Sequence, residues 1–281
     1  LLLLAIVTGT GIYAIDWPIP DIVPERNFAQ NDGGAPLLGM SFVSEGPIYA
    51  AEQGETVFAR STGERVSGLP SPLGSWIAVD LGDGLVNIYA RYAESAEYLS
   101  AHIEKQQIIA QSGKSGANDK NGFYFSFFDR KEHRWINPAT VILNPFPDTR
   151  PPAIGAVRLQ NSDGGMVNIA QTRTIKQGRY AIFVETSDTY DGGAQPLAPN
   201  SIASFVNGTE AGILVFENFS ARNGLLMVYR NTLLSANRIY AVPNAYEAGE
   251  FWFPRGIAIL ELIVGDRAGN ISTASYRLVI E

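Results

Sequence analysis

The hydrophobic positions of this chain fall in short runs rich in Val, Ile, Tyr and Phe, and helical spacing is scarce. Gly, Asn, Asp and Pro separate these runs. Short β-rich runs with such punctuation are typical of strands joined by turns. Strands are predicted over residues 76–81, 86–92, 123–128, 180–185, 225–229, 257–264 and 276–280. The pattern therefore predicts an all-β protein.

Two of the connections carry explicit turn residues. Gly82-Asp83-Gly84 lies between two predicted strands and indicates a hairpin, because glycine tolerates the positive φ of tight turns. Asp266-Arg-Ala-Gly-Asn270 indicates a second hairpin, in which Asp bonds to its own backbone. One short helix is predicted over residues 93–99.

A proline-rich stretch divides the chain. Residues 144–152 contain four prolines in nine positions, and proline fixes φ and removes a hydrogen-bond donor. Such a stretch favours a semi-rigid connector over a strand. Domains are therefore predicted over residues 15–143 and 153–281, with residues 144–152 as the linker.

The first fourteen residues have the character of an export signal. Residues 1–7 are an apolar run that is followed by a Thr- and Gly-containing stretch ending at Ala14, as in a secretory hydrophobic region before its cleavage site. The run is too short to cross a bilayer as a helix. We predict a signal-peptide remnant over residues 1–14, no membrane span in the mature chain, and a periplasmic or extracellular location. The alternative is a buried first strand.

Composition excludes several functions. The chain has 21 Lys and Arg against 28 Asp and Glu, for a formal charge of −7, and no basic cluster. Nucleic acid is therefore an unsuitable partner, because its affinity comes largely from phosphate neutralisation. The absence of cysteine excludes disulfides and thiolate metal sites. Only two histidines are present, so no metal ion and no other cofactor are predicted.

The N-terminal half carries a series of short segments that resembles a known family. The segments are LLGMSF at 37–42, PIYAAEQGETV at 47–57, VNIYARY at 86–92, IAQSGKSG at 109–116, GFYFSF at 122–127 and WINP at 135–138. Their order and spacing over residues 25–143 resemble those of the LytM-like (M23) peptidoglycan endopeptidases. The resemblance implies a LytM-like β-domain of the barrel-sandwich hybrid type.

The resemblance also implies where a zinc site would lie. In active members of the family, two histidines and an aspartate hold zinc, and two further histidines support the attacking water. The ligand positions correspond to Leu37, Ser41 and Ser126, and the catalytic histidines to Arg91 and Tyr124. None of these five residues matches the family, which predicts a pseudoenzyme rather than an enzyme. The expected function is non-catalytic: binding peptidoglycan, or regulating a wall hydrolase such as an amidase or another envelope protein.

Other functions stay open on the sequence alone. A residual hydrolase could use an unrecognised site, for example a carboxylate pair among Asp80, Asp83, Glu94, Glu97 and Asp129. A purely structural protein would only space an envelope assembly. For the groove itself, Tyr124, Arg91, Phe28 and Tyr92 could offer a binding surface, or ordinary strand residues could simply fill it.

The second domain resembles a bacterial immunoglobulin-like β-sandwich. The resemblance rests on the Asp266–Asn270 turn and on residues 180–193, which look like an earlier strand and loop of such a module. Residues 201–217 and 232–253 are less regular and are expected to form loops or extra hairpins. Asp188, Asp191 and Asp266 could supply oxygens to calcium. Two interpretations stay open for the aromatic residues of this region: a sugar- or protein-binding platform, or the core, which uses such rings more often and is expected for most of them. These residues are Tyr240, Tyr246, Phe251, Trp252 and Phe253.

Overall fold

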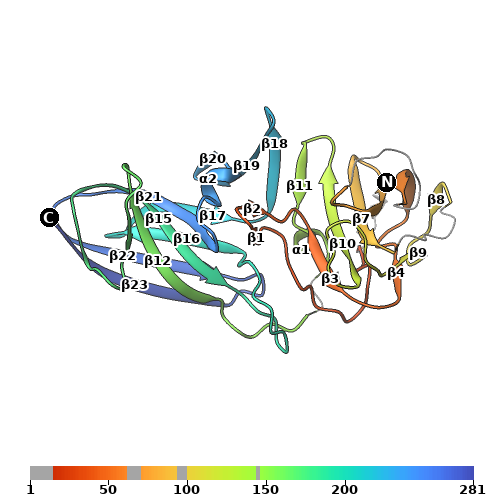
Figure 1. Ribbon diagram of the computed structural model, residues 1–281, viewed down its shortest axis with the longest axis horizontal. Coiled ribbons are helices and arrows are strands. Elements are labelled where there is room, and N and C mark those ends of the chain that lie inside the picture. Colours follow the sequence, from red (N-terminus) through yellow and green to blue (C-terminus); the bar gives the residue numbers. More distant parts are fainter. Residues whose placement is uncertain (1–14, 62–70, 94–99, 144–145) are drawn as a thin grey trace, which may run out of the picture.

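The computed structural model describes residues 15–61, 71–93, 100–143 and 146–281. They form an elongated molecule of two β-rich bodies, which we call the N-terminal lobe (residues 15–143) and the C-terminal lobe (residues 153–281) (Figure 1). The predicted all-β class is confirmed. The predicted signal segment (1–14) and most of the predicted helix (94–99) lie outside the described residues.

The N-terminal lobe contains short strands and one helical turn. They are β1 (Asn31–Asp32), β2 (Ala35–Pro36), β3 (Met40–Val43), β4 (Pro47–Tyr49), β5 (Gly54–Arg60), β6 (Ser75–Asp80), β7 (Leu85–Tyr92), β8 (His102–Ile103), β9 (Ile108–Gln111), β10 (Gly122–Asp129), β11 (Arg134–Ile136) and α1 (Pro138–Val141). The predicted hairpin joins β6 to β7, with Asp83 at φ 52° and Gly84 at φ 88°.

The C-terminal lobe has longer strands. They are β12 (Ala153–Asn161), β13 (Met166–Asn168), β14 (Thr174–Ile175), β15 (Gly178–Ser187), β16 (Ser201–Val206), β17 (Thr209–Val215), β18 (Asn218–Arg222), β19 (Leu225–Arg230), β20 (Thr232–Ser235), α2 (Ala236–Ile239), β21 (Ala245–Phe253), β22 (Gly256–Gly265) and β23 (Ile271–Ile280). All seven strands predicted from the sequence are present.

The side chains of β10 point alternately to the two sides of the sheet in the N-terminal lobe. Phe123, Phe125 and Phe127 point into a core that also holds Ile77 and Tyr89. The residues between them lie on the opposite side of the sheet formed by β5, β6, β7 and β10. We call this opposite side the site face, because the five candidate positions lie on it or at its edge.

The C-terminal lobe is a β-sandwich. One layer is ordered β14-β23-β22-β16-β17, and the other β13-β12-β15-β21. The layers pack closely where Gly212 meets Ala248: a Cβ on Gly212 would lie 2.4 Å from the Ala248 carbonyl oxygen. The predicted turn joins β22 to β23, and Asp266 Oδ1 accepts bonds from the backbone N–H groups of Gly269 and Asn270.

Two expectations for this lobe can be compared with the structure. Residues 201–215 form a hairpin, β16 and β17, which is one of the two forms expected for this region and is regular along its length. Of the five aromatic residues expected mainly in the core, Tyr240, Tyr246 and Phe253 are buried, but Trp252 is half exposed. Trp252 lies on the outer side of β21, because its neighbour Phe253 points inward. The immunoglobulin-like relationship stays a prediction.

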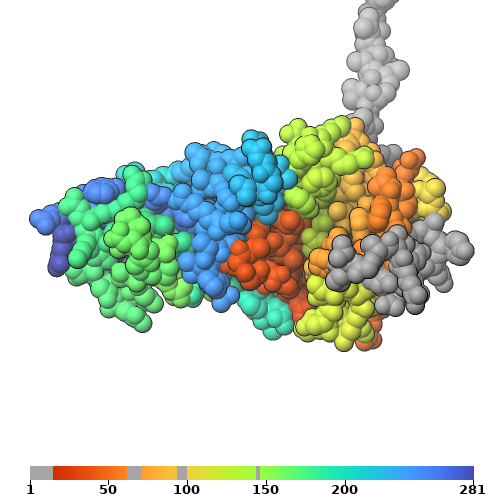
Figure 2. All heavy atoms as spheres, turned by 45° about the horizontal axis from the view of Figure 1, so that its top comes forward, coloured from red at the N-terminus to blue at the C-terminus, as the bar shows by residue number. Residues whose placement is uncertain are grey.

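The lobes are joined by more than the linker. β11 pairs with β18, with Trp135 opposite Phe219, so one sheet runs through both lobes. Phe28 and Ala29 belong to the C-terminal core. In Figure 2, the red-orange start of the described chain lies between the blue atoms of the C-terminal lobe and the yellow-green atoms of the N-terminal lobe. The domain limits predicted at the linker stay a prediction.

Asn27 and Asn137 strengthen this junction. The Asn27 side chain donates to the Ala198 carbonyl and accepts from the Ala198 N–H, at 2.8 and 2.7 Å. Asn137 caps α1 and also donates to the Phe216 carbonyl at 2.9 Å. Such paired bonds fix the lobes against each other. Among the described residues, no helix has the length and apolar character needed to cross a bilayer.

Candidate functional site

The five positions singled out from the sequence gather in one place. Ser41 on β3 lies opposite Tyr124 on β10, and Ser126 follows two residues later on the same strand. Leu37 contacts Tyr124 in a small apolar cluster with Ala90. The Arg91 guanidinium lies 4.9 Å from the centre of the Tyr124 ring. Tyr124 is the centre of the group.

The backbone of Gly39 lies close to the Tyr124 ring and keeps the ring in this position. A Cβ on Gly39 would lie 2.7 Å from Tyr124 Cζ and 2.4 Å from the Phe125 carbonyl oxygen. Only a residue without a side chain leaves room for the ring there. Burial raises the pKa of Tyr124 to about 12, with Ser126 and Arg91 acting in the opposite direction. The ring is therefore a neutral phenol that fills the site.

These residues do not fit a zinc ion. Zinc requires imidazole, thiolate or carboxylate ligands, and Leu37 has no lone pair to donate. Ser41 Oγ is buried without a hydrogen-bond partner, but a neutral hydroxyl is a poor zinc ligand. Arg91 adds a permanent positive charge next to the tyrosine. These five side chains therefore do not supply the ligand set that zinc requires.

Two residues offered as groove surface are buried elsewhere. Phe28 packs on Phe219 in the C-terminal core, with ring centres 5.3 Å apart, and Tyr92 lies in the N-terminal core. The expectation that they face the groove is wrong. The carboxylates considered for hydrolysis are engaged where the structure describes them: Asp80 pairs with Arg130, and Asp129 with Arg134. Glu94 and Glu97 lie outside the described residues.

An aromatic pair that the sequence did not single out lies next to Tyr124. The rings of Phe58 on β5 and Trp76 on β6 stack with centres 4.3 Å apart. Trp76 also packs against the Leu37–Tyr124 cluster, while Phe58 is 45% exposed. Ile88 on β7 continues this apolar surface. On the site face, Tyr124 therefore fills the centre, and the ring of Phe58 is exposed to one side of it.

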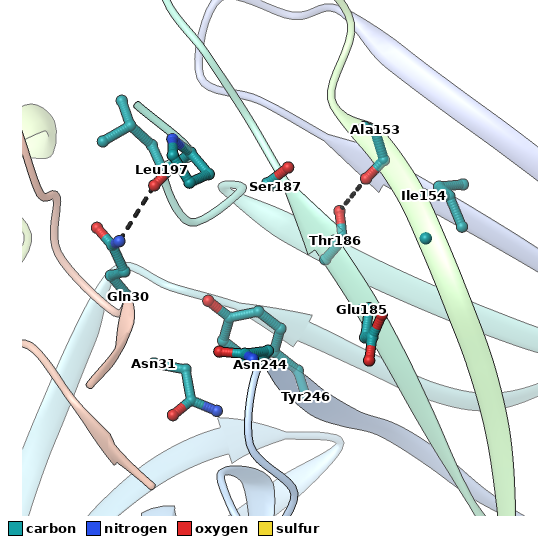
Figure 3. A pocket seen from close by; sticks show the side chains of 12 residues that line it. Gln30, Asn31, Ala153, Ile154, Glu185, Thr186, Ser187, Leu197, Asn244 and Tyr246 are labelled. Carbon is teal, nitrogen blue, oxygen red and sulfur yellow. Dashed lines mark hydrogen bonds between the residues drawn. The ribbon is translucent and has the colours of Figure 1, made fainter. Parts of the chain in front are cut away.

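A separate pocket of about 350 Å³ lies at the junction of the lobes (Figure 3). Most of the polar side chains that line it form hydrogen bonds or ion pairs with other residues of the protein. Gln30 Nε2 donates to the Pro196 carbonyl, and Thr186 Oγ1 donates to the Ala153 carbonyl at 2.7 Å. Glu185 is paired with Arg158. These contacts make the pocket part of the structural junction.

Three carboxylates meet at the same junction. Oxygens of Asp148, Asp188 and Asp266 lie within 4.8 Å of one another, a geometry compatible with an oxygen-preferring cation. Of the three aspartates that the sequence offered as candidate calcium ligands, Asp188 and Asp266 belong to this group, whereas Asp191 accepts bonds from the Thr149 backbone and hydroxyl. Burial, with repulsion from Asp148 and Asp266, raises the pKa of Asp188 to about 7.

The Asp188→Asn variant is expected to be more stable than the wild type at pH 8, with the difference vanishing near pH 4. The folded pKa of about 7 exceeds the value of about 3.9 in an unfolded chain. The folded state therefore holds more protons between these values, and stability falls as the pH rises through that window. Urea unfolding midpoints measured across this range test the prediction.

Asparagine keeps the Oδ1 that accepts from the Thr189 N–H. Asp163→Asn, which removes a carboxylate from an exposed turn, is the matched control. If the urea midpoints of Asp188→Asn and the wild type differed by the same amount from pH 4 to pH 8, burial would not be what raises the pKa of Asp188.

Comparison with known proteins gives limited likenesses. The model of an uncharacterised family matches residues 151–281. No curated protein matches the chain. The chain is similar to a mutant catalytic domain of the prophage-encoded M23 protein EnpA from Enterococcus faecalis, at 17% identity over 42% of this chain and 88% of that one, with a TM-score of 0.35.

Two further solved structures show a comparable likeness. The SpoIIQ–SpoIIIAH pore-forming complex matches at 18% identity over 46% of this chain and 90% of that one, with a TM-score of 0.37. The solution structure of lysostaphin matches at 13% identity over 78% of this chain and 87% of that one, also with a TM-score of 0.37. At this level of similarity, function has to be inferred from the residues themselves.

Proposed function

We propose that the protein is an exported, non-catalytic cell-envelope protein that uses a peptidase-like scaffold to bind peptidoglycan. One observation carries the proposal: the five positions that correspond to the zinc and catalytic residues lie together, and a buried tyrosine fills their centre. A scaffold that retains this arrangement without a usable ligand set is suited to binding rather than hydrolysis. The periplasm or the cell exterior is the proposed location.

The aromatic side of the site face supports a binding role. Phe58 exposes a ring that stacks on Trp76, and Ile88 extends the surface towards Tyr124. Aromatic side chains contribute large contact areas at low entropic cost and dominate recognition surfaces. The sugar rings and short peptides of the wall offer apolar faces to such a surface.

The purified protein is expected to produce no clearing in a zymogram of labelled peptidoglycan, with or without added zinc. The physical reason is the ligand set: Leu37 and Ser126 replace two metal-binding residues, and Arg91 repels a cation. An active M23 peptidase in a neighbouring lane provides the positive control. Reproducible clearing by the wild type that follows the protein through purification would overturn the non-catalytic assignment.

Phe58→Ala is expected to weaken co-sedimentation with purified sacculi by about tenfold, the loss of one well-placed aromatic contact. Because Phe58 is half exposed, the variant should lose about 1 kcal/mol of stability or less and stay folded in the assay. Tyr229→Ala is the matched control, since this exposed aromatic lies on the other lobe. Equal losses for both variants would contradict a role for the site face. Wild-type protein that stays in the supernatant would instead favour a wall hydrolase as the partner.

A further inference from the structure

Strand β22 has the sequence of a strand that is covered on both sides. Ala258, Leu260, Leu262 and Val264 point into the C-terminal core. The alternate positions are also apolar apart from Glu261: they are Ile257, Ile259 and Ile263. An antiparallel sheet with one solvated side normally alternates apolar and polar residues. In the described chain these isoleucines face outward, and Ile257 is 57% exposed.

The neighbouring strands extend this apolar surface. We define the outer face as the side of β16, β17, β22 and β23 turned away from the core, and these strands lie side by side in the lobe that carries the C-terminus (Figure 1). Ile263 lies opposite Ala203, which lies opposite Ile213. The apolar members are Ala203, Phe205, Ile213, Val215, Ile257, Ile259, Ile263, Ile271 and Val279.

The area of the outer face is that of an interaction surface. At about 3.4 Å per residue and about 4.8 Å between strands, the shorter β16 and β17 and the longer β22 and β23 together cover on the order of 500 Å², polar positions included. Apolar side chains hold more than half of the positions on this face. A contiguous apolar patch of a few hundred Å² is as large as the patches that often serve as binding surfaces.

Charge on the outer face indicates what covers it. Glu261 and Arg277 are both exposed, and neither forms an ion pair within the part of the chain that the structure describes. Glu261 lies opposite Ser275 and Arg277 opposite Ile259, so the two charges stand two residues apart on adjacent strands. A two-fold axis that lies in the plane of the interface, midway between these two side chains, would bring each charge against the opposite charge of a second copy.

We propose that the outer face is the isologous interface of a homodimer, in which Glu261 of each copy pairs with Arg277 of the other. Two faces together bury on the order of 1,000 Å², which is the lower end of specific interfaces. The dimer is therefore weak and forms in the micromolar range. Glu210, which also lies on this face, is already bonded to Asn231 at 2.6 Å and stays at the rim.

Sedimentation velocity on the full chain tests the proposal over chain concentrations from about 1 µM to about 500 µM. The 30.5 kDa monomer should convert to a species of twice this mass as the concentration rises. Ile263→Lys should weaken self-association at least about tenfold. Ile108→Lys, an equally drastic change at an exposed position on the other lobe, is the matched control.

A charge swap separates this interface from any other. Glu261→Arg and Arg277→Glu should each weaken the dimer by placing like charges against each other, and the double variant should restore it. Circular dichroism checks the fold, and Ile271→Lys is a second apolar variant should Ile263→Lys misfold. A monomer at every concentration overturns the proposal, and so does a dimer that none of the face variants affects. Binding of sacculi or lipid vesicles that depends on Ile263 in a monomeric chain would assign the face to that occupant and overturn it as well.

Discussion

Replacing Glu247 with alanine is expected to lower the free energy of unfolding by about 3–5 kcal/mol, because it leaves a buried cation without its partner. Glu247 is 2% exposed and accepts from Arg230 Nη1 at 2.7 Å. It also accepts from Arg238, whose pKa its hydrogen bonds raise further above the usual range. Arg230 is itself buried, so water cannot replace the lost carboxylate. Chemical denaturation measures the loss.

Two further variants distinguish the cost of leaving a buried charge unpaired from the small cost of losing a surface ion pair. Glu250→Ala removes the more exposed partner of Arg238 and should cost about 1 kcal/mol or less. Combining Arg230→Met with Glu247→Leu should recover most of the stability, since an apolar pair of similar volume needs no counter-charge. A Glu247→Ala variant as stable as the Glu250→Ala variant would contradict the assignment of a buried network.

The elements that the sequence predicts well are those governed by neighbouring residues. The alternation of residues 123–128 is enough to place Phe123, Phe125 and Phe127 on one side of β10. The turn at Asp266 is equally local, because the aspartate bonds to backbone N–H groups three and four residues away. In both cases the physical cause lies within the segment itself.

The features that escaped prediction depend on contacts between distant segments. Phe28 lies beside the site residues in the sequence but packs in the C-terminal core, and no local signal marks this. Asp148 joins Asp188 and Asp266 only because the linker returns to the sandwich. The motif resemblance pointed to five positions, but the filling of the centre by Tyr124 follows from strand pairing and from Gly39.

The orientation of Phe58 depends on a β-bulge that the alternation of residues along the sequence does not predict. The pairing of β5 with β6 shifts register between Thr56 and Phe58, so the extra residue Val57 reverses the alternation. A one-residue shift moves every following side chain to the other side of the sheet. The bulge is what places Phe58 on the site face next to Trp76, and the sequence alone does not reveal it.

Phe28→Ala is expected to lower the free energy of unfolding of the C-terminal lobe by about 3–5 kcal/mol, the usual cost of truncating a buried phenylalanine. Phe28 is 1% exposed and packs on Phe219, which lies opposite Trp135 where the sheet passes between the lobes. The adjacent Ala29 carbonyl accepts from the Tyr240 hydroxyl at 2.7 Å. Hydrogen exchange at core amides such as that of Leu214 should accelerate, although the substitution lies in the N-terminal lobe.

The matched control is Phe58→Ala, which removes an equal side chain from an exposed position and should cost about 1 kcal/mol or less. Because the β11–β18 pairing remains in Phe28→Ala, the lobes should stay attached while the C-terminal core loosens. Accelerated exchange confined to the N-terminal lobe would contradict this. A C-terminal core that depends on Phe28 also means that cutting the chain at the linker cannot yield two intact halves, because the N-terminal fragment would expose this ring and the C-terminal fragment would keep its cavity.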